Sequence, residues 1–120
     1  MIGKQVLIVD DSPVIHNMLR KTLEGNGYSV CGDASNGREG VELYESLKPD
    51  LVFMDVTMPI MDGIAALKII REKDAVAKVI MLTAMGDDEI IAQAQAAGAV
   101  SFLKKPFNDF KIISALAQIE

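Results

Sequence analysis

The chain has 120 residues, of which 50% are apolar and 24% are charged, and its formal net charge is −5 at pH 7. This composition is typical of one soluble globular domain, here residues 1–120, and excludes a disordered chain. The negative charge argues against nucleic-acid binding, which needs clustered Lys and Arg. The single cysteine excludes an internal disulfide, and no apolar run is long enough to span a membrane or act as a signal peptide, so we expect a cytoplasmic protein without membrane association.

Five short apolar segments predict β-strands, and several are continuous runs such as VLIV, LVFM and VIML. Continuous runs are typical of strands covered on both faces, as in a parallel sheet. The predicted strands are Gln5–Val9, Ser29–Asp33, Leu51–Met54, Val79–Leu82 and Ser101–Leu103.

The segments between and after these strands have the apolar spacing of helices. Ser12 predicts an N-cap for the first helix, with Pro13 as the first helical residue. The other helices are expected to begin after Asn36, near Gly63, in the acidic run Asp87–Glu89 and after Asn108. The last helix is predicted to bury Ile112, Ile113, Leu116 and Ile119.

A strand followed by a helix thus occurs five times along the chain. Parallel strands need crossover connections, which helices supply, and such crossovers are almost always right-handed. The pattern predicts an open, doubly wound α/β sheet that binds ligands beyond the carboxyl ends of its strands.

Polar side chains occur where four of the predicted strands end: Asp10 and Asp11, Asp55, Thr83, and Lys104 and Lys105. Two carboxylates about 5 Å apart repel by about 3 kcal/mol at an effective dielectric of about 20. If the first and third strands are neighbours, three carboxylates meet, and a cation is needed among them. Oxygen ligands at an open edge favour Mg²⁺.

The remaining polar groups at this edge indicate phosphoryl chemistry. Lys105 supplies a positive charge and Thr83 a hydroxyl, and both can hold phosphoryl oxygens. Asp55 is the candidate nucleophile, because a carboxylate needs no general base at neutral pH.

Four motifs in order, VLIVDD, MDVTMPIMDG, LTA and KKPF, give the chain a specific resemblance to the receiver domains of two-component response regulators, over nearly its whole length. The resemblance implies a five-stranded flavodoxin-like sheet with strand order 2-1-3-4-5. It implies that Asp55 accepts a phosphoryl group from a phosphohistidine of a histidine kinase or phosphotransfer protein. The product would be an aspartyl phosphate.

The resemblance also implies roles for the residues around Asp55. Asp11, Asp55 and the main-chain carbonyl of Thr57 would ligate Mg²⁺, with Asp10 acting through water. Thr83 and Lys105 would contact the phosphoryl oxygens. The Lys105–Pro106 peptide bond would be cis.

The resemblance also assigns four positions to switching and phosphate lifetime. Phosphorylation would draw Thr83 toward the new anion, and Phe102, where many members have Tyr, would move into the space that is freed. A phenyl ring has no hydroxyl, so only a steric form of this switch can operate. By the same resemblance, Thr57 and Met85 would flank the path of the attacking water, and the bulk of Met85 should slow dephosphorylation.

Other polar residues have simpler interpretations. His16 falls on the polar face of the first helix and is expected to be a solvated surface residue rather than a metal ligand. The run Asp87–Glu89 is expected to stabilise a helix start. Lys104 is expected to be a solvated charge, which leaves Lys105 as the functional lysine.

These features predict a switch rather than a turnover enzyme, one that catalyses only its own phosphorylation and dephosphorylation. We expect a monomeric, single-domain regulator of the chemotaxis type, whose face of fourth helix, fifth strand and fifth helix binds a downstream protein. Alternatives are a phosphorelay intermediate and the isolated receiver domain of a larger regulator. An Asp-nucleophile phosphohydrolase and a flavin carrier fit less well, because the first would favour Asp-x-Asp after strand one and the second would be repelled by Asp10 and Asp11.

Overall fold

The computed structural model describes residues 3–84 and 88–119, which form an α/β domain with a parallel sheet. The strands are β1 (Gln5–Val9), β2 (Ser29–Ala34), β3 (Leu51–Asp55), β4 (Val79–Thr83) and β5 (Ser101–Lys104). Their order in the sheet is β2-β1-β3-β4-β5, and every neighbouring pair is parallel. This is the predicted doubly wound sheet, and its order places the ends of β1 and β3 side by side.

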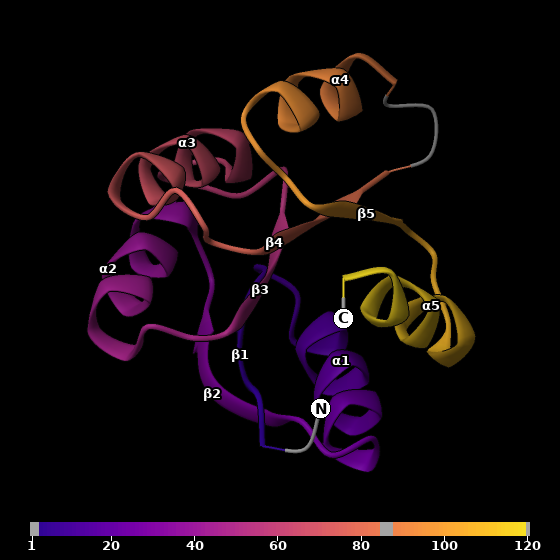
Figure 1. The fold of residues 1–120 in the computed structure, drawn as a ribbon. Coiled ribbons are helices and arrows are strands. Elements are labelled where there is room, and N and C mark those ends of the chain that lie inside the picture. The colour runs from indigo at the N-terminus through magenta and orange to yellow at the C-terminus, as the bar shows by residue number, and fades with distance from the viewer. Residues whose placement is uncertain (1–2, 85–87, 120) are drawn as a thin grey trace.

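The helices lie on both faces of the sheet. They are α1 (Pro13–Gly25), α2 (Gly37–Leu47), α3 (Gly63–Lys73), α4 (Asp88–Ala96) and α5 (Asp109–Ile119). Figure 1 shows α2, α3 and α4 on one side of the sheet and α1 and α5 on the other. Two separate apolar clusters fill the spaces between sheet and helices, one on each face.

Local capping fixes where α1, α2 and α3 begin. The Ser12 hydroxyl accepts a hydrogen bond from Ile15 N, and Asn36 Oδ1 accepts one from Glu39 N at 2.9 Å. Asp62 Oδ1 accepts from Ala65 N at 2.8 Å in the same way. Each cap satisfies an amide that the first helical turn leaves free, so the chain turns sharply after β1, β2 and the β3–α3 loop.

The strands that carry site residues are one residue longer than predicted. Asp55 pairs with Leu82, and Thr83 pairs with Lys104, so these polar residues belong to the ladder rather than to the loops after it. The sequence pattern ends a strand at its last apolar residue, whereas hydrogen bonding between parallel neighbours continues past it. As a result Asp55 and Thr83 sit on a rigid part of the backbone.

The core matches most of the apolar pattern, but Leu47 in α2 is 41% exposed and α5 holds a second exception. Ile112 and Leu116 are buried, but Ile113 is 43% exposed, so the prediction that it faces the core was wrong. Ile112 and Leu116 are four positions apart and share a helix face, while Ile113 lies about 100° further round the helix axis. None of the described helices combines the length and apolar character that crossing a membrane requires.

The start of α3 lies directly against the end of β3. Gly63 N donates a 2.7 Å hydrogen bond to Val56 O, and a Cβ on Gly63 would lie 1.9 Å from the carbonyl oxygen of Asp55. A side chain cannot fit at that distance, so glycine is required for this close approach. The contact fixes the backbone of the candidate nucleophile.

Candidate phosphoacceptor and metal site

Three carboxylates meet at the carboxyl ends of β1 and β3. Asp10 and Asp11 follow β1 directly, and Asp55 is the last residue of β3. One oxygen from each of the three side chains lies within 4.8 Å of the other two. Asp10 and Asp55 are buried and Asp11 is exposed, so the cluster opens to solvent on one side. An open set of hard oxygen ligands suits a partly hydrated Mg²⁺ ion.

Lys105, after β5, reaches across the sheet edge to two of these carboxylates. Its Nζ lies 3.1 Å from Asp10 Oδ2 and donates a 3.2 Å hydrogen bond to Asp55 Oδ1. The neighbouring Lys104 is exposed, as expected for a solvated charge. The Lys105–Pro106 peptide bond is cis. Lys105 is therefore the lysine that supplies positive charge to the cluster.

Burial and charge act in opposite directions on Asp55. Burial raises the pKa of its carboxyl group, and the nearby Asp10 charge raises it further, while Lys105 opposes both and leaves the pKa above its usual value. For Lys105, burial lowers the pKa of the amine, but contact with Asp10 and Asp55 outweighs this and raises it. The cluster thus holds more negative charge than its lysine offsets, which favours a further cation.

Thr83, at the end of β4, is almost fully buried, at 1% exposure. Its Oγ1 has no hydrogen-bond partner among the described residues. An unpaired buried hydroxyl is costly, and it is available to an acceptor that arrives in the site. A phosphoryl oxygen is such an acceptor.

Of the other predicted site residues, Thr57 and Phe102 lie in the described part of the chain and Met85 does not. Thr57 is exposed in the loop between β3 and α3, two residues after Asp55. Phe102 in β5 is half-buried and packs against the core on the α2–α4 face. Met85 and Asp87 lie outside the described residues, whereas Asp88 and Glu89 are exposed in the first turn of α4.

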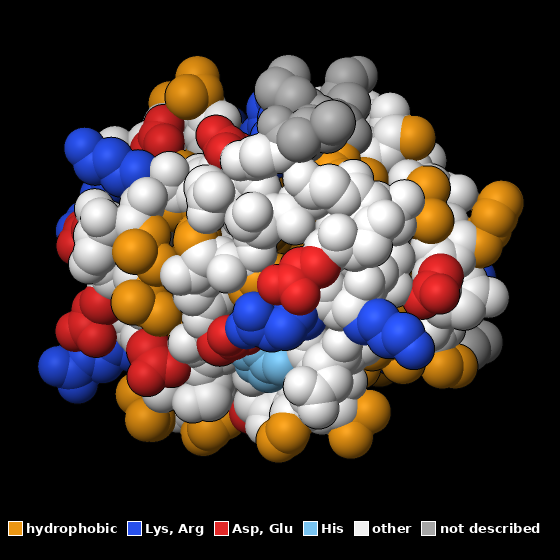
Figure 2. Space-filling view, turned by 90° about the horizontal axis from the view of Figure 1, so that it is seen from below, with side chains coloured by type: hydrophobic (Ala, Val, Ile, Leu, Met, Phe, Trp, Pro, Cys, Tyr) orange, Lys and Arg blue, Asp and Glu red, His pale blue; other side chains and the backbone are white. Residues whose placement is uncertain are grey.

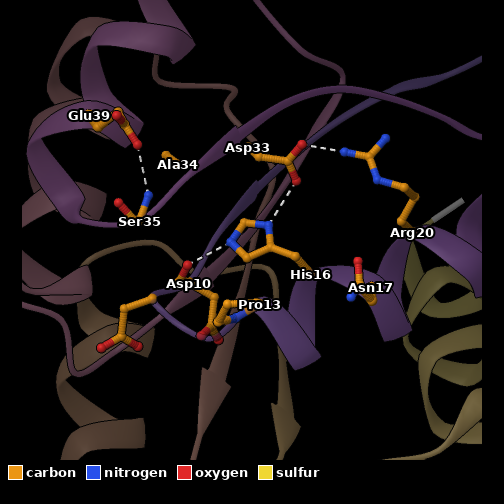
Figure 3. A pocket seen from close by; sticks show the side chains of 10 residues that line it. Asp10, Pro13, His16, Asn17, Arg20, Asp33, Ala34, Ser35 and Glu39 are labelled. Atoms are coloured by element: carbon orange, nitrogen blue, oxygen red, sulfur yellow. Dashed lines mark hydrogen bonds and ion pairs between the residues drawn. The ribbon is translucent and has the colours of Figure 1, made fainter.

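His16 is a site residue whose environment was predicted wrongly. Its side chain is only 15% exposed, and Figure 2 shows the pale-blue histidine largely covered by charged side chains. Its ring contacts the Asp10 carbonyl and the Asp33 carboxylate (Figure 3). His16 is covered although Asn17 and Lys21 on the same helix are exposed, because β2 lies next to β1 and brings Asp33 against the ring. Predicting the burial of His16 required the strand order, which the helical spacing of apolar residues does not give.

Comparison with known proteins agrees with this geometry. A family model described as the response regulator receiver domain matches residues 6–117. The chain belongs to this family. It is 47% identical to the chemotaxis protein CheY of Thermotoga maritima over 118 residues, which cover 98% of each chain. It is 45% identical to the CheY protein of Bacillus subtilis over 115 residues, or 96% of each chain.

The solved structures agree with the sequence comparison. This receiver domain superposes with a TM-score of 0.94 on a chain of the CheX–CheY–BeF₃–Mg²⁺ complex from Borrelia burgdorferi, at 34% identity and covering 98% of this chain and 90% of that one. The chain is therefore a CheY-like receiver domain, a phosphorylation-dependent response regulator in chemotaxis. Its family is one of signalling switches, and its acidic cluster is of the kind that suits Mg²⁺.

Proposed function

We propose that residues 1–120 act as one receiver domain in which Asp55 accepts a phosphoryl group from a phosphohistidine of a partner kinase or phosphotransfer protein. One Asp55 oxygen forms a bond to phosphorus as the phosphorus–nitrogen bond breaks, and the departing imidazole takes up a proton. The observation that carries this proposal is the meeting of three carboxylates within 4.8 Å, with Lys105 bonded to Asp55. Of the three, Asp55 is the one that belongs to a strand, as the last residue of β3 at the centre of the sheet.

Asp10, Asp11 and Asp55, with the main-chain carbonyl of Thr57, are the residues we expect to hold Mg²⁺. Their donor set is all oxygen, and the pKa of the Asp55 carboxyl group is raised first by burial and then by the Asp10 charge, both of which a bound divalent ion would counter. When bound, the ion would neutralise charge on the phosphoryl group during transfer. Lys105 and Thr83 would hold the phosphoryl oxygens from the side of β4 and β5.

The switch would couple Thr83 to Phe102. The unpaired Thr83 hydroxyl turns toward the new phosphoryl oxygens, and the half-buried Phe102 ring moves into the space that this leaves. Since the ring has no hydroxyl, its two positions differ in packing alone. The signal then appears on the face formed by α4, β5 and α5.

That face offers a groove between β5 and α5 in which Phe110 is 75% exposed and Lys104 and Lys111 supply positive charge. We propose that a downstream effector binds there and that the receiver acts as a monomer in the cytoplasm. It would catalyse its own phosphorylation and dephosphorylation and no other turnover. Exposed apolar residues beside basic ones are typical of protein-binding surfaces.

Phosphate lifetime is expected to depend on Thr57 and Met85. We expect Met85→Ala to admit water more readily and to shorten the life of the aspartyl phosphate. The rate of loss of the phosphoryl group after removal of the donor measures this. An unchanged rate in Met85→Ala would remove Met85 from the proposal.

The decisive experiment is incubation of the protein with acetyl phosphate and Mg²⁺, followed by mass spectrometry. We expect one phosphoryl adduct that hydroxylamine removes and that is absent from Asp55→Asn. Asp62→Asn is the matched control, because Asp62 caps α3 nearby and asparagine caps equally well, so its adduct should persist. Turnover of added phosphomonoesters would instead indicate a phosphohydrolase, and a protein that purifies yellow would indicate a flavin carrier.

A further inference from the structure

His16 makes two hydrogen bonds that connect the candidate metal site to the edge of the sheet. Its Nε2 lies 2.6 Å from the main-chain oxygen of Asp10, and its Nδ1 lies 2.7 Å from Asp33 Oδ1. The Asp10 carbonyl oxygen can only accept, so the ring donates to it through Nε2. Figure 3 shows the ring between these two partners, with Arg20 on the far side of Asp33.

The oxygen that His16 contacts belongs to the peptide group joining Asp10 to Asp11. Because a peptide group is planar, a bond that orients this carbonyl also orients the amide of Asp11. The ladder between β1 and β3 ends at Val9, so strand pairing with β3 does not hold this peptide group. Within residues 3–84 and 88–119, His16 is the only hydrogen-bond donor to this carbonyl.

The rest of the Asp10 backbone and side chain is already held in place. Asp10 N donates to Ala34 O at 3.0 Å, and Asp10 Oδ1 accepts from Ser12 N at 2.8 Å. Asp11 is exposed, and its side chain has no such restraint from the part of the chain that the structure describes. The direction in which Asp11 leaves the sheet therefore depends on its peptide group with Asp10, which the Ser12 turn spans and whose carbonyl His16 holds.

The far side of the ring is fixed as well. Asp33, at the end of β2, bonds His16 through one carboxylate oxygen and pairs with Arg20 through the other. Arg20 also lies 3.6 Å from Glu24, four residues along α1. A carboxylate that orients an imidazole, which in turn orients a ligand group, is the arrangement that outer partners of metal sites adopt.

We infer that His16 is a positioning residue for Mg²⁺: its hydrogen bond to the Asp10 carbonyl holds the Asp10–Asp11 peptide group so that the Asp11 carboxylate meets those of Asp10 and Asp55. This inference rests on the proposed function, because it assigns the metal to that carboxylate cluster. His16 itself does not ligate the ion, since both ring nitrogens are engaged.

Two substitutions at His16 distinguish its hydrogen bond to Asp10 from its hydrogen bond to Asp33. The amide nitrogen of Gln reaches as far as Nε2 of His, so H16Q retains donation to the Asp10 carbonyl. The amide of Asn reaches only as far as Nδ1, so H16N retains the Asp33 side and loses the Asp10 side. Thr22→Val is the matched control, because Thr22 Oγ1 donates a 2.6 Å bond to Asp109 from the same helix, away from the carboxylates.

Titration of the Mg²⁺-free proteins with Mg²⁺ in a calorimeter tests the inference. We expect H16N to bind Mg²⁺ about 10-fold more weakly than the native protein, as loss of an outer hydrogen bond at metal sites does. H16Q and Thr22→Val should keep nearly native affinity. Urea unfolding of the same variants reports stability separately, and we expect Thr22→Val to lose stability without losing Mg²⁺ affinity.

Native affinity in H16N would overturn the inference, as would equal losses in H16N and H16Q or an equal loss in Thr22→Val. These results leave the proposed function in place as long as the native protein binds Mg²⁺ and forms the Asp55 adduct. A native protein that binds no Mg²⁺ would overturn the metal site and the inference together.

Discussion

At the scale of single residues, the site combines groups that are costly to the resting fold. Asp55 is a buried carboxylate beside Asp10, and Thr83 buries a hydroxyl without a partner among the described residues. Both costs fall when a cation and a phosphoryl group arrive, so the same residues that lower stability provide the driving force for binding. The residues at the strand ends therefore favour ligand binding at the expense of the stability of the ligand-free protein.

Asp55→Asn tests how much the buried charge of Asp55 lowers the stability of the folded protein. Since the folded-state pKa of the Asp55 carboxyl group is raised, ionising it favours the unfolded state, and the native protein loses stability as pH rises through that pKa. Without Mg²⁺, Asp55→Asn should therefore be more stable than the native protein at neutral pH. The difference should vanish below the ordinary aspartate pKa of about 4.

Urea unfolding across this pH range in EDTA measures the effect. Lys105 keeps its contact with Asp10 in the variant, so no charge is left buried alone. A stability advantage for Asp55→Asn that is the same at acidic and neutral pH would contradict the electrostatic explanation.

Ile60 carries a different local cost, in the loop between β3 and α3. Its φ is +70° although it is β-branched, and its side chain is 77% exposed. A left-handed backbone costs such a residue about 1–2 kcal/mol, whereas asparagine adopts it readily. We expect Ile60→Asn to raise the free energy of unfolding by about 1 kcal/mol.

Val76→Asn is the comparison for Ile60→Asn. Val76 is 80% exposed in a loop and does not have a positive φ, so its replacement should change the free energy of unfolding by less than about 0.5 kcal/mol. Chemical denaturation compares the two variants. Equal effects at both positions would show that exposure, not backbone strain, governs the change.

At the scale of elements, the site depends on how closely a helix approaches the strand that carries Asp55. The first residue of α3, Gly63, lies against the carbonyl of Asp55. The buried apolar residues of β1 and β3 leave no room for the strand ends to move, because both faces are covered. The elements thus act as a rigid frame for the carboxylates.

Gly63→Ala is expected to damage both stability and the site. Its methyl group would lie 1.9 Å from Asp55 O, so β3 or α3 must shift, at a cost of about 3 kcal/mol. Asp55 would move with β3, and phosphorylation by acetyl phosphate should slow. Gly25→Ala is the control, since nothing lies within 4 Å of the added methyl, and it should change stability by less than about 0.5 kcal/mol. Similar losses at the two glycines would refute the close-approach argument.

At the scale of the whole molecule, ligand binding and folding are linked. The carboxylates come from segments more than 40 residues apart and meet only in the folded chain, so a metal bound among them stabilises the native state alone. Lys105, from the end of β5, completes the same cluster. The site is a property of the assembled sheet.

Mg²⁺ should accordingly raise thermal stability. At a concentration about 100 times the Kd, the gain is about 2.7 kcal/mol. This corresponds to a rise in Tm of roughly 10 °C for a domain of this size. EDTA should reverse the shift, and Asp11→Asn should show less of it, as measured by circular dichroism. A full shift in Asp11→Asn would remove Asp11 from the proposed ligands.

The fold and most of the site could be predicted from local patterns. Continuous apolar runs predict buried parallel strands, Ser12 with Pro13 predicts the start of α1, and the structure contains both. Carboxylates after strands one and three predict a cation site if those strands are neighbours, and that strand order came from the resemblance to receiver domains. These inferences rest on interactions between residues close in sequence, and those interactions act before the fold is complete.

Other features were decided only by tertiary structure. Whether His16 faces water depends on Asp33, 17 residues away, being brought over α1 by the neighbouring strand. The 43% exposure of Ile113 and the close contact at Gly63 depend likewise on which element packs alongside. Burial and contact between segments distant in the sequence are set by how the elements pack. A local sequence pattern does not say which distant residues become neighbours in the folded chain.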